Sequence, residues 1–224
     1  LDEIFRIGDY ITVFRHGEAV ETCPVSQVES KSQLISMMLG KVIFPQYAGG
    51  RTLSDQVVLE ASHLKSRVLR DISFQLYQGE VLGFYGLVGA GKSEIARAVY
   101  GADRTEGTVT VEGKPVNRRS PHTAVKSSLA LVPEERRTEG IFGRLSIREN
   151  ICLMNVKRVM NGWILSRKKE EKLAEDYIAR LAIATDSMEK PVGFLSGGNQ
   201  QKVVLAKCMN AHAKILMLDE PTRG

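Results

Sequence analysis

Apolar positions recur with the periods of regular secondary structure over most of the chain beyond residue 56. Short apolar runs predict five strands, at residues 57–64, 68–76, 80–86, 128–133 and 215–218. The run at 80–86 is apolar at nearly every position, as in a strand that is covered on both faces. Helices are predicted at residues 92–101, 146–153 and 166–183 and from Ser196 onward, with a hairpin at 107–116 that turns at Glu112 and Gly113. Strands alternating with helices predict an α/β fold with a mostly parallel sheet.

The first 55 residues have a different pattern. Residues 1–22 predict a short helix and then a hairpin that turns at His16 and Gly17, and a second helix is predicted from Ser32 to Leu39. Residues 41–55 contain a proline and a Gly-Gly pair and show no sustained period, so we predict a linker there. The predicted parts are therefore residues 1–40, residues 41–55 and residues 56–224.

Composition narrows the classes of function. The 224 residues are 43% hydrophobic and 25% charged, which is ordinary for a globular protein, and the net charge is +5. The basic residues are mostly dispersed pairs flanked by acids, so we expect solvated surface and no nucleic-acid partner. The three cysteines have neither metal-ligand nor disulfide spacing, which favours a reducing compartment. No apolar run is long enough to span a bilayer, so we expect any membrane role to be peripheral.

A glycine-rich stretch, GLVGAGKSE, lies between the predicted strand at 80–86 and the helix that follows it. Its spacing is that of a phosphate-binding loop, in which glycines let backbone N–H groups converge on an anion at a helix start. Lys92 would reach the terminal phosphates, and the Ser93 hydroxyl would coordinate Mg²⁺. The predicted nucleotide-binding residues are Gly86, Leu87, Val88, Gly89, Ala90, Gly91, Lys92, Ser93 and Glu94.

Two acidic residues directly follow the apolar strand predicted at 215–218. The carboxyl ends of parallel strands are where α/β folds bind their ligands, so this position suits a catalytic site. Asp219 is predicted to hold Mg²⁺, usually through water. Glu220 is predicted to orient or deprotonate the attacking water, and with Lys92 it forms the predicted catalytic pair.

A third motif, LSGGNQQK, opens the helix that begins at Ser196. The three motifs together resemble those of an ATP-binding cassette (ABC) ATPase, with Asp219 lying 219 − 196 = 23 residues after Ser196. The resemblance implies a P-loop NTPase fold with an antiparallel β lobe and a small helical subdomain, and it implies ATP and Mg²⁺ as cofactors. It also implies that the signature motif closes over a phosphate held by a second cassette. The signature residues are Leu195, Ser196, Gly197, Gly198 and Asn199.

Further stretches resemble carbohydrate importers in which one polypeptide carries two cassettes. LSGGNQQKV, LDEPTRG and VPEERRTEGIF are similar to the second cassette, and residues 1–18 are similar to the tail of the first. We therefore expect both ends of the chain to be cut. The resemblance implies transmembrane permease subunits and a second nucleotide-binding cassette as partners, with a periplasmic sugar-binding protein acting indirectly. It implies a peripheral position on the cytoplasmic face of a bacterial inner membrane.

The chain departs from the family pattern at four points. Glu134 stands at the Q-loop position, where the family usually has glutamine, and Asn199 also replaces a glutamine. Residues 63–71 offer no aromatic to stack on adenine, and no switch histidine follows Asp219. We expect all four histidines of the chain, His16, His63, His122 and His212, to lie on the surface or in loops.

Local readings of three other residues and of one segment complete the predictions. Trp163 is expected to pack in the helical subdomain, and Glu149 and Asn150 are expected at a solvated helix end. Two placements of the first 22 residues stay open. They either dock beside the sheet of the second cassette or pack elsewhere, and docking would bury Ile4, Phe5, Ile11, Val13 and Phe14.

The predicted function is ATP hydrolysis that energises sugar import, and other functions stay open. One is an ATP-binding module with little or no hydrolysis, favoured by Glu134 and by the missing histidine. Another is a non-transport ABC ATPase of DNA repair, although only 196 − 92 = 104 residues separate Lys92 from Ser196 and there is no C-x-x-C. A ribosome-acting ABC protein would carry a long charged helix between cassettes, whereas the predicted linker is short. The transported sugar is not specified by the sequence.

Overall fold

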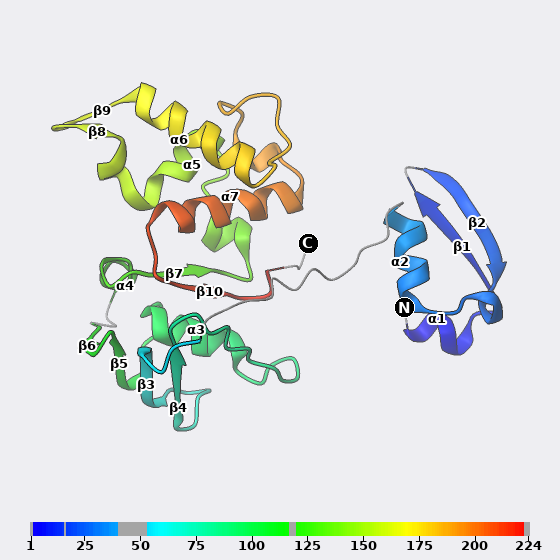
Figure 1. The fold of residues 1–224 in the computed structure, drawn as a ribbon, viewed down its shortest axis with the longest axis horizontal. Coiled ribbons are helices and arrows are strands. Elements are labelled where there is room, and N and C mark those ends of the chain that lie inside the picture. Colours follow the sequence, from blue (N-terminus) through cyan, green and yellow to red (C-terminus); the bar gives the residue numbers. More distant parts are fainter. Residues whose placement is uncertain (1, 16, 40–52, 117–119, 222–224) are drawn as a thin grey trace. The chain divides into compact units, whose positions relative to one another are not determined.

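The computed structural model describes residues 2–15, 17–39, 53–116 and 120–221, and it divides into two compact units, Leu1–Arg51 and Thr52–Gly224 (Figure 1). Most of the predicted linker at 41–55 lies outside the described residues. The two units are described separately below.

The N-terminal unit contains the predicted helices and hairpin. Its elements are α1 (Asp2–Ile7), β1 (Tyr10–Arg15), β2 (Glu18–Pro24), η1 (Val25–Gln27) and α2 (Lys31–Leu39). The two strands pair antiparallel, from Tyr10 opposite Pro24 to Arg15 opposite Glu18. Gly17 lies at the turn with φ +87°, a backbone angle that glycine adopts without strain, whereas His16 is outside the described residues. A small core of Val13, Val28 and Leu34 holds the unit together.

An antiparallel lobe opens the C-terminal unit. Its strands are β3 (Val57–Lys65), β4 (Ile72–Tyr77), β5 (Glu106–Val111) and β6 (Lys114–Pro115), in the spatial order β4-β3-β5-β6. The predicted turn is confirmed, because Glu112 and Gly113 have φ +49° and +74°, as a two-residue hairpin loop with two positive φ angles requires. The lobe shares an apolar core with α3 (Lys92–Tyr100) and α4 (Pro121–Lys126).

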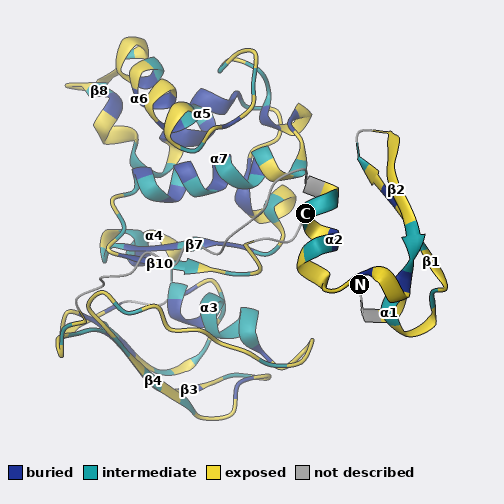
Figure 2. Ribbon diagram, turned by 45° about the vertical axis from the view of Figure 1, so that its right-hand side comes forward, coloured by how far each residue is buried: buried dark blue, intermediate teal, exposed yellow. Residues whose placement is uncertain are grey.

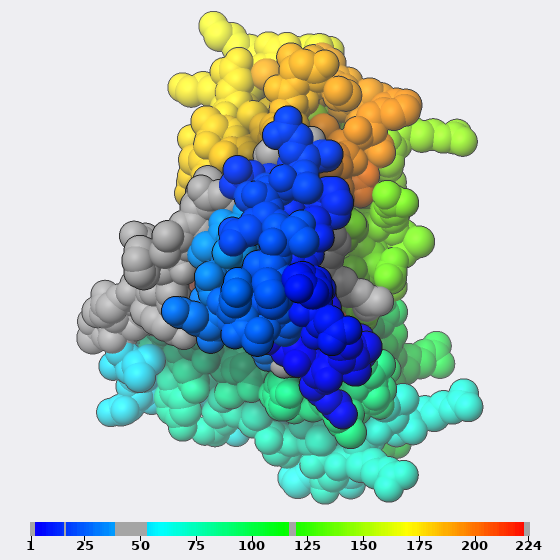
Figure 3. Space-filling view, turned by 90° about the vertical axis from the view of Figure 1, so that its right-hand side faces the viewer, coloured from blue at the N-terminus to red at the C-terminus, as the bar shows by residue number. Residues whose placement is uncertain are grey.

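The parallel part of the sheet consists of β7 (Leu129–Val132) and β10 (Ile215–Leu218), which pair from Leu129 opposite Ile215 to Val132 opposite Leu218. They lie between the lobe and the helical part of the unit (Figure 1). In the space-filling view the lobe, in cyan and green, and the helical part, in yellow and orange, occupy opposite ends of this unit (Figure 3).

The strand predicted at 80–86 is wrong, because these residues lie outside any helix or strand. Val81 is 71% exposed and Tyr85 is fully exposed. A cavity of about 630 Å³ is lined by Val81, Leu82 and Phe84 on one side and by Leu216–Leu218 of β10 on another. Phe84 packs edge-on against Phe74 of β4, with ring centroids 5.0 Å apart. The apolar pattern predicts burial on two faces, and the described part of the chain covers this segment on one.

The helical part has its own core. It contains α5 (Ile147–Cys152), η3 (Leu153–Val159), β8 (Met160–Asn161), β9 (Ile164–Leu165), α6 (Arg167–Arg180), η4 (Val192–Phe194) and α7 (Gly197–Asn210). Figure 2 shows buried residues concentrated on α5 and on parts of α7. Ser146 and Glu149 form a capping box at the start of α5, which explains why the helix begins there.

Two predictions about residues of the helical part are wrong. Trp163 is 96% exposed, because it lies in the two-residue turn of the β8–β9 hairpin, where no core reaches it. Asn150 is fully buried rather than at a solvated helix end. Its amide nitrogen donates to the carbonyl oxygens of Phe142, Leu145 and Ser146 at 3.1, 3.3 and 3.0 Å, and its oxygen accepts from the Phe142 N–H at 2.9 Å.

A buried ion pair ties α5 to α6. The Arg148 guanidinium, on a side chain that is 7% exposed, donates to Glu170 at 2.5 Å and to Glu189 at 2.8 Å. The hydrogen bond to Glu189 raises the pKa of Arg148 and lowers that of Glu189. The pair therefore fixes the order of packing in the helical part, since a charge left alone there would be costly.

Candidate nucleotide-binding site

The glycine-rich loop curls back on itself before α3. Gly89 and Gly91 have φ +81° and +93°, angles that side chains rarely permit, and a Cβ on Gly86 would approach that of Ala90 to 3.2 Å. Gly91 lies directly before α3, so the free N–H groups of the first helical turn face the curled loop. The geometry is therefore that of an anion site formed by backbone.

Lys92 lies over this loop. Its ammonium donates to the carbonyl oxygens of Gly86 and Leu87 at 2.9 and 3.1 Å. The positive charge is thus held at the mouth of the loop, where a phosphate would exchange for these two neutral acceptors. The neighbouring Leu87 and Val88 are exposed.

The structure brings Ser93 and Glu134 together across 41 residues of sequence, with Ser93 Oγ 3.4 Å from Glu134 Oε2. Asp219 continues the parallel ladder, because its N–H donates to the Val132 carbonyl at 3.0 Å. Glu134 and Asp219 therefore follow the carboxyl ends of adjacent strands. A hydroxyl with one or two carboxylates at such a strand end fits Mg²⁺, which also takes phosphate oxygens and water as ligands.

Within the described ranges, no three or more His, Cys, Asp or Glu side chains gather as a metal cage. Glu220 has φ +44° and is exposed, next to the half-buried Asp219. A left-handed backbone angle at a non-glycine residue is uncommon, and it turns the chain sharply at the end of β10.

The signature residues divide into two groups. Leu195 is buried in the core of the helical part, whereas Ser196 and Gly198 are exposed at the start of α7. The Asn199 side chain donates to Ser196 Oγ at 3.0 Å and accepts from the Ala184 N–H at 2.9 Å. A Cβ on Gly197 would collide with the Arg136 guanidinium, so this glycine is required by a close approach.

Gln200, which the sequence did not single out, anchors the signature. It is buried, and its amide nitrogen donates to the carbonyl oxygens of Val192, Gly193 and Leu195 at 3.4, 3.2 and 3.1 Å. A glutamine inside an amphipathic helix gives no sequence signal for such a role. The hydrogen bonds fix the chain just before Ser196 and hold the helix start in place.

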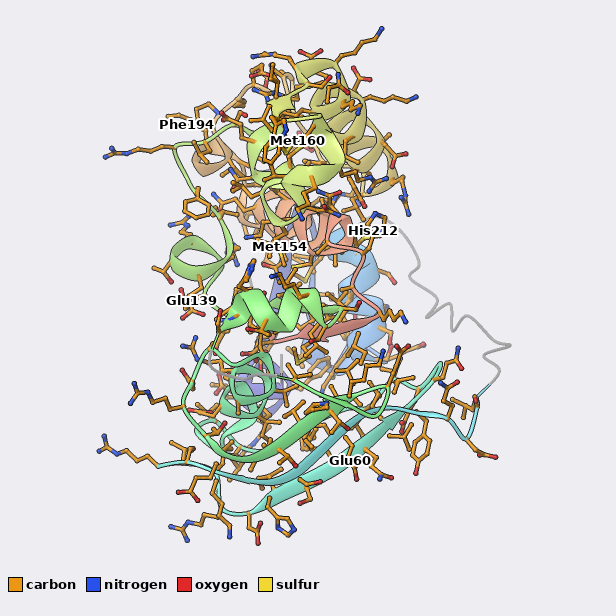
Figure 4. All side chains as sticks on the ribbon, turned by 90° about the vertical axis from the view of Figure 1, so that its left-hand side faces the viewer. Glu60, Glu139, Met154, Met160, Phe194 and His212 are labelled. Carbon is orange, nitrogen blue, oxygen red and sulfur yellow. The ribbon has the colours of Figure 1, made fainter. Side chains whose placement is uncertain are left out.

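The turn Arg136–Gly140 links the two glycine-rich helix starts, and this connection was also missed. From this turn, Glu139 accepts two 2.7 Å hydrogen bonds from Arg97 of α3 (Figure 4). The Gly140 carbonyl accepts from the ammonium of Lys207 on α7. Arg97 also pairs with Asp103 at 2.9 Å, and this hydrogen bond is the main reason why its pKa is raised. Burial lowers the pKa of Lys207.

Known proteins place these features in a family. The sequence profile of the ABC transporter family matches residues 69–223. The chain belongs to the ABC transporter family. The galactofuranose transporter ATP-binding protein YtfR of Escherichia coli K12 is 40% identical over 234 residues, which cover 100% of this chain and 46% of that protein. An arabinose import ATP-binding protein, AraG of Rhizobium johnstonii, is 41% identical over 227 residues, covering 100% and 45%. This ABC chain thus spans about half the length of the curated relatives it matches.

Solved ABC cassettes share the fold. A nucleotide-free ATP-binding cassette from an ABC transporter aligns with a TM-score of 0.60 at 20% identity, covering 75% of this chain and 70% of that one. The cassette MJ0796, solved with ADP and Pi bound, aligns with a TM-score of 0.61 at 18% identity, covering 73% and 74%. The predicted fold class and family are therefore confirmed.

The remaining findings concern predicted surface residues of this ABC chain. His63, His122 and His212 are exposed as predicted, and His16 lies outside the described residues. His63 makes a 2.8 Å hydrogen bond with Asp71, a local pair on the β lobe. None of the helices in the described part of the chain combines the length and apolarity needed to cross a bilayer.

Proposed function

We propose that this chain is part of an ATP-binding and ATP-hydrolysing subunit that energises sugar import. The curled loop of residues 86–91, with the Lys92 ammonium held over it at the start of α3, carries the proposal of nucleotide binding. Relatives that align with the whole chain are named for galactofuranose transport and for arabinose import, which supports a sugar as cargo.

The loop residues would bind the phosphates of ATP. Backbone N–H groups of residues 86–91 and the Lys92 charge meet the β- and γ-phosphates, and Glu94 lies in the first turn of α3. Ser93 and Asp219 are the residues proposed to hold Mg²⁺, which when bound neutralises charge on the phosphate oxygens. Glu220 is proposed to accept a proton from the water that attacks the terminal phosphorus, with ADP as the leaving group.

The exposed signature residues Ser196 and Gly198 are proposed to serve a second cassette. Since Asn199 uses its side chain within its own subdomain, the Ser196 hydroxyl and the N–H groups of the first helical turn are what this helix start offers a partner. Transmembrane permease subunits and, through them, a periplasmic sugar-binding protein are the other proposed partners. The proposed location is the cytoplasmic face of a bacterial inner membrane.

The test is sugar-stimulated ATP hydrolysis by the full-length subunit reconstituted with its permease. Lys92→Ala is expected to abolish nucleotide binding at this site, whereas Lys126→Ala, an exposed lysine on α4, is expected to leave it unchanged. Unchanged nucleotide affinity in Lys92→Ala would show that the loop assignment is wrong. Normal hydrolysis without stimulation by any sugar would contradict the import role alone.

A binding module with little hydrolysis is a second candidate, and the contact between Ser93 and Glu134 favours it. A carboxylate at this point repels phosphate and occupies the hydroxyl proposed for Mg²⁺. Glu134→Gln is then expected to raise ATP affinity by about tenfold, since it removes one like charge near the phosphates. If hydrolysis is measurable only in Glu134→Gln, the binding module is the better description.

A further inference from the structure

The β8–β9 hairpin is an exposed apolar tip on the helical part. Asn161 pairs with Ile164 around the two-residue turn Gly162–Trp163, and Gly162 takes φ +60°, which the first residue of such a turn requires. The exposed fractions are 96% for Trp163, 75% for Ile164 and 53% for Leu165. Figure 1 shows β8 and β9 projecting from the helical part.

Basic residues surround the base of this hairpin. Residues 156–169 contain five of them and no acid, and they are Lys157, Arg158, Arg167, Lys168 and Lys169. Strand pairing of Met160 with Leu165, and the hydrogen bond from Ser166 N–H to the Val159 carbonyl at 2.8 Å, bring both groups to the same end of the hairpin. Lys169 donates to the Met160 carbonyl at 2.7 Å, which places its ammonium there directly.

Most of this charge is not explained by the fold. Arg167 is paired with Glu171 and Glu189, and Arg158 donates to Asn210, but Lys157 and Lys168 are exposed. Arg167, Lys168 and Lys169 lie in the first turn of α6, where the helix dipole disfavours cations. Their presence therefore lowers the stability of the helix and favours an anionic partner outside it.

We propose that the β8–β9 hairpin is an interfacial anchor, which inserts Trp163 and Ile164 into the headgroup region of an anionic lipid bilayer. Lys157 and Lys168 contact lipid phosphates beside it. A narrow tip with an aromatic ring at its end and a basic collar matches a lipid interface, where Trp is favoured and each basic residue adds affinity. A protein interface needs a broader apolar centre of roughly 800 Å² per partner.

The test uses Trp163 itself, because it is the only tryptophan of the chain. Vesicles of equimolar phosphatidylcholine and phosphatidylglycerol are added to the chain without nucleotide, so the result does not depend on the proposed ATPase. We expect a blue shift of the Trp163 emission, protection from iodide quenching and co-sedimentation with these vesicles. Vesicles of phosphatidylcholine alone are expected to give little of each.

Variants then separate the two parts of the anchor. Lys157→Gln with Lys168→Gln is expected to weaken vesicle binding by about twenty-five-fold, or about fivefold per lysine. Trp163→Ser is expected to weaken it by about tenfold. The matched control, Lys114→Gln with Lys126→Gln, changes two exposed lysines far from the hairpin in sequence and is expected to change binding less than about twofold.

Three outcomes would overturn the proposal. One is an unshifted emission with anionic vesicles, and another is wild-type sedimentation by Trp163→Ser. The third is a shift that appears only with detergent-solubilised permease, since the hairpin would then be a protein contact.

Discussion

The two glycine-rich helix starts of the C-terminal unit are supported very differently. The signature start is held by side chains close to it in sequence, with Gln200 on three carbonyl groups and Asn199 on Ser196 and Ala184. The phosphate loop follows residues 80–86, which lie outside any strand, and Lys92 bonds to its own loop. A helix start held by local side chains needs few distant neighbours, whereas a loop after a buried strand depends on the strands beside it.

The same contrast predicts where substitutions change stability. In the helical part, polar side chains are buried and paired, so their removal leaves groups without partners. In the segment before the phosphate loop, large apolar side chains are already exposed, so their removal costs little. Four substitutions measure this contrast by the free energy of unfolding in urea.

Arg148→Met is expected to have the largest effect. It leaves the Glu170 carboxylate, on a side chain that is 12% exposed, without its cation, which costs about 3–5 kcal/mol. Arg180→Met is the matched control, since Arg180 pairs with Asp176 on the exposed face of the same helix, and it is expected to cost less than about 1 kcal/mol. Equal losses in both variants would contradict the distinction between the pairs.

Asn150→Ala is expected to cost about 1–3 kcal/mol, because one buried N–H and three carbonyl groups lose their partner. The urea midpoint of this variant is the measurement. An unchanged midpoint would mean that the backbone between Phe142 and Ser146 is held by other contacts.

Glu139→Gln is expected to cost about 1 kcal/mol, since Arg97 keeps Asp103 but loses its bond to the turn Arg136–Gly140. Asp103→Asn is the control, because Asp103 also pairs with Arg97 but follows it closely in sequence. We expect only Glu139→Gln to change ATP hydrolysis at the site served by the signature, because only Glu139 connects α3 to that turn. The same loss of hydrolysis in Asp103→Asn would disprove this.

Tyr85→Ser is expected to change stability by less than about 0.5 kcal/mol, as is usual for a fully exposed position. A loss of several kcal/mol would show that residues 80–86 are buried in a strand in solution, as their sequence predicts. This variant therefore tests the segment on which sequence and structure disagree most.

Sequence patterns predicted the elements whose determinants lie within a few residues of one another. The capping box of Ser146 and Glu149 starts α5, and Glu112 with Gly113 forms the turn between β5 and β6. The three ATPase motifs were also visible, because each is a contiguous run around a strand end or a helix start.

Features that depend on distant neighbours were not predicted. The strand at 80–86 requires a covering neighbour on its second face, and the contact between Ser93 and Glu134 joins residues 41 positions apart. Trp163 was placed in the core because aromatic residues are usually buried, but the glycine turn beside it exposes it.

The parallel pairing of β7 with β10 has a consequence for synthesis of the chain. Each paired residue is 215 − 129 = 86 positions from its partner, and the whole helical part lies between them. Closing a loop of that length costs about 2 kcal/mol more entropy than closing one of about ten residues. During translation the helical part leaves the ribosome first and can pack on its own core, and β10 joins β7 only afterwards. Asp219 and Glu220 follow β10, so the carboxylates of the nucleotide site reach their position in the last step of folding.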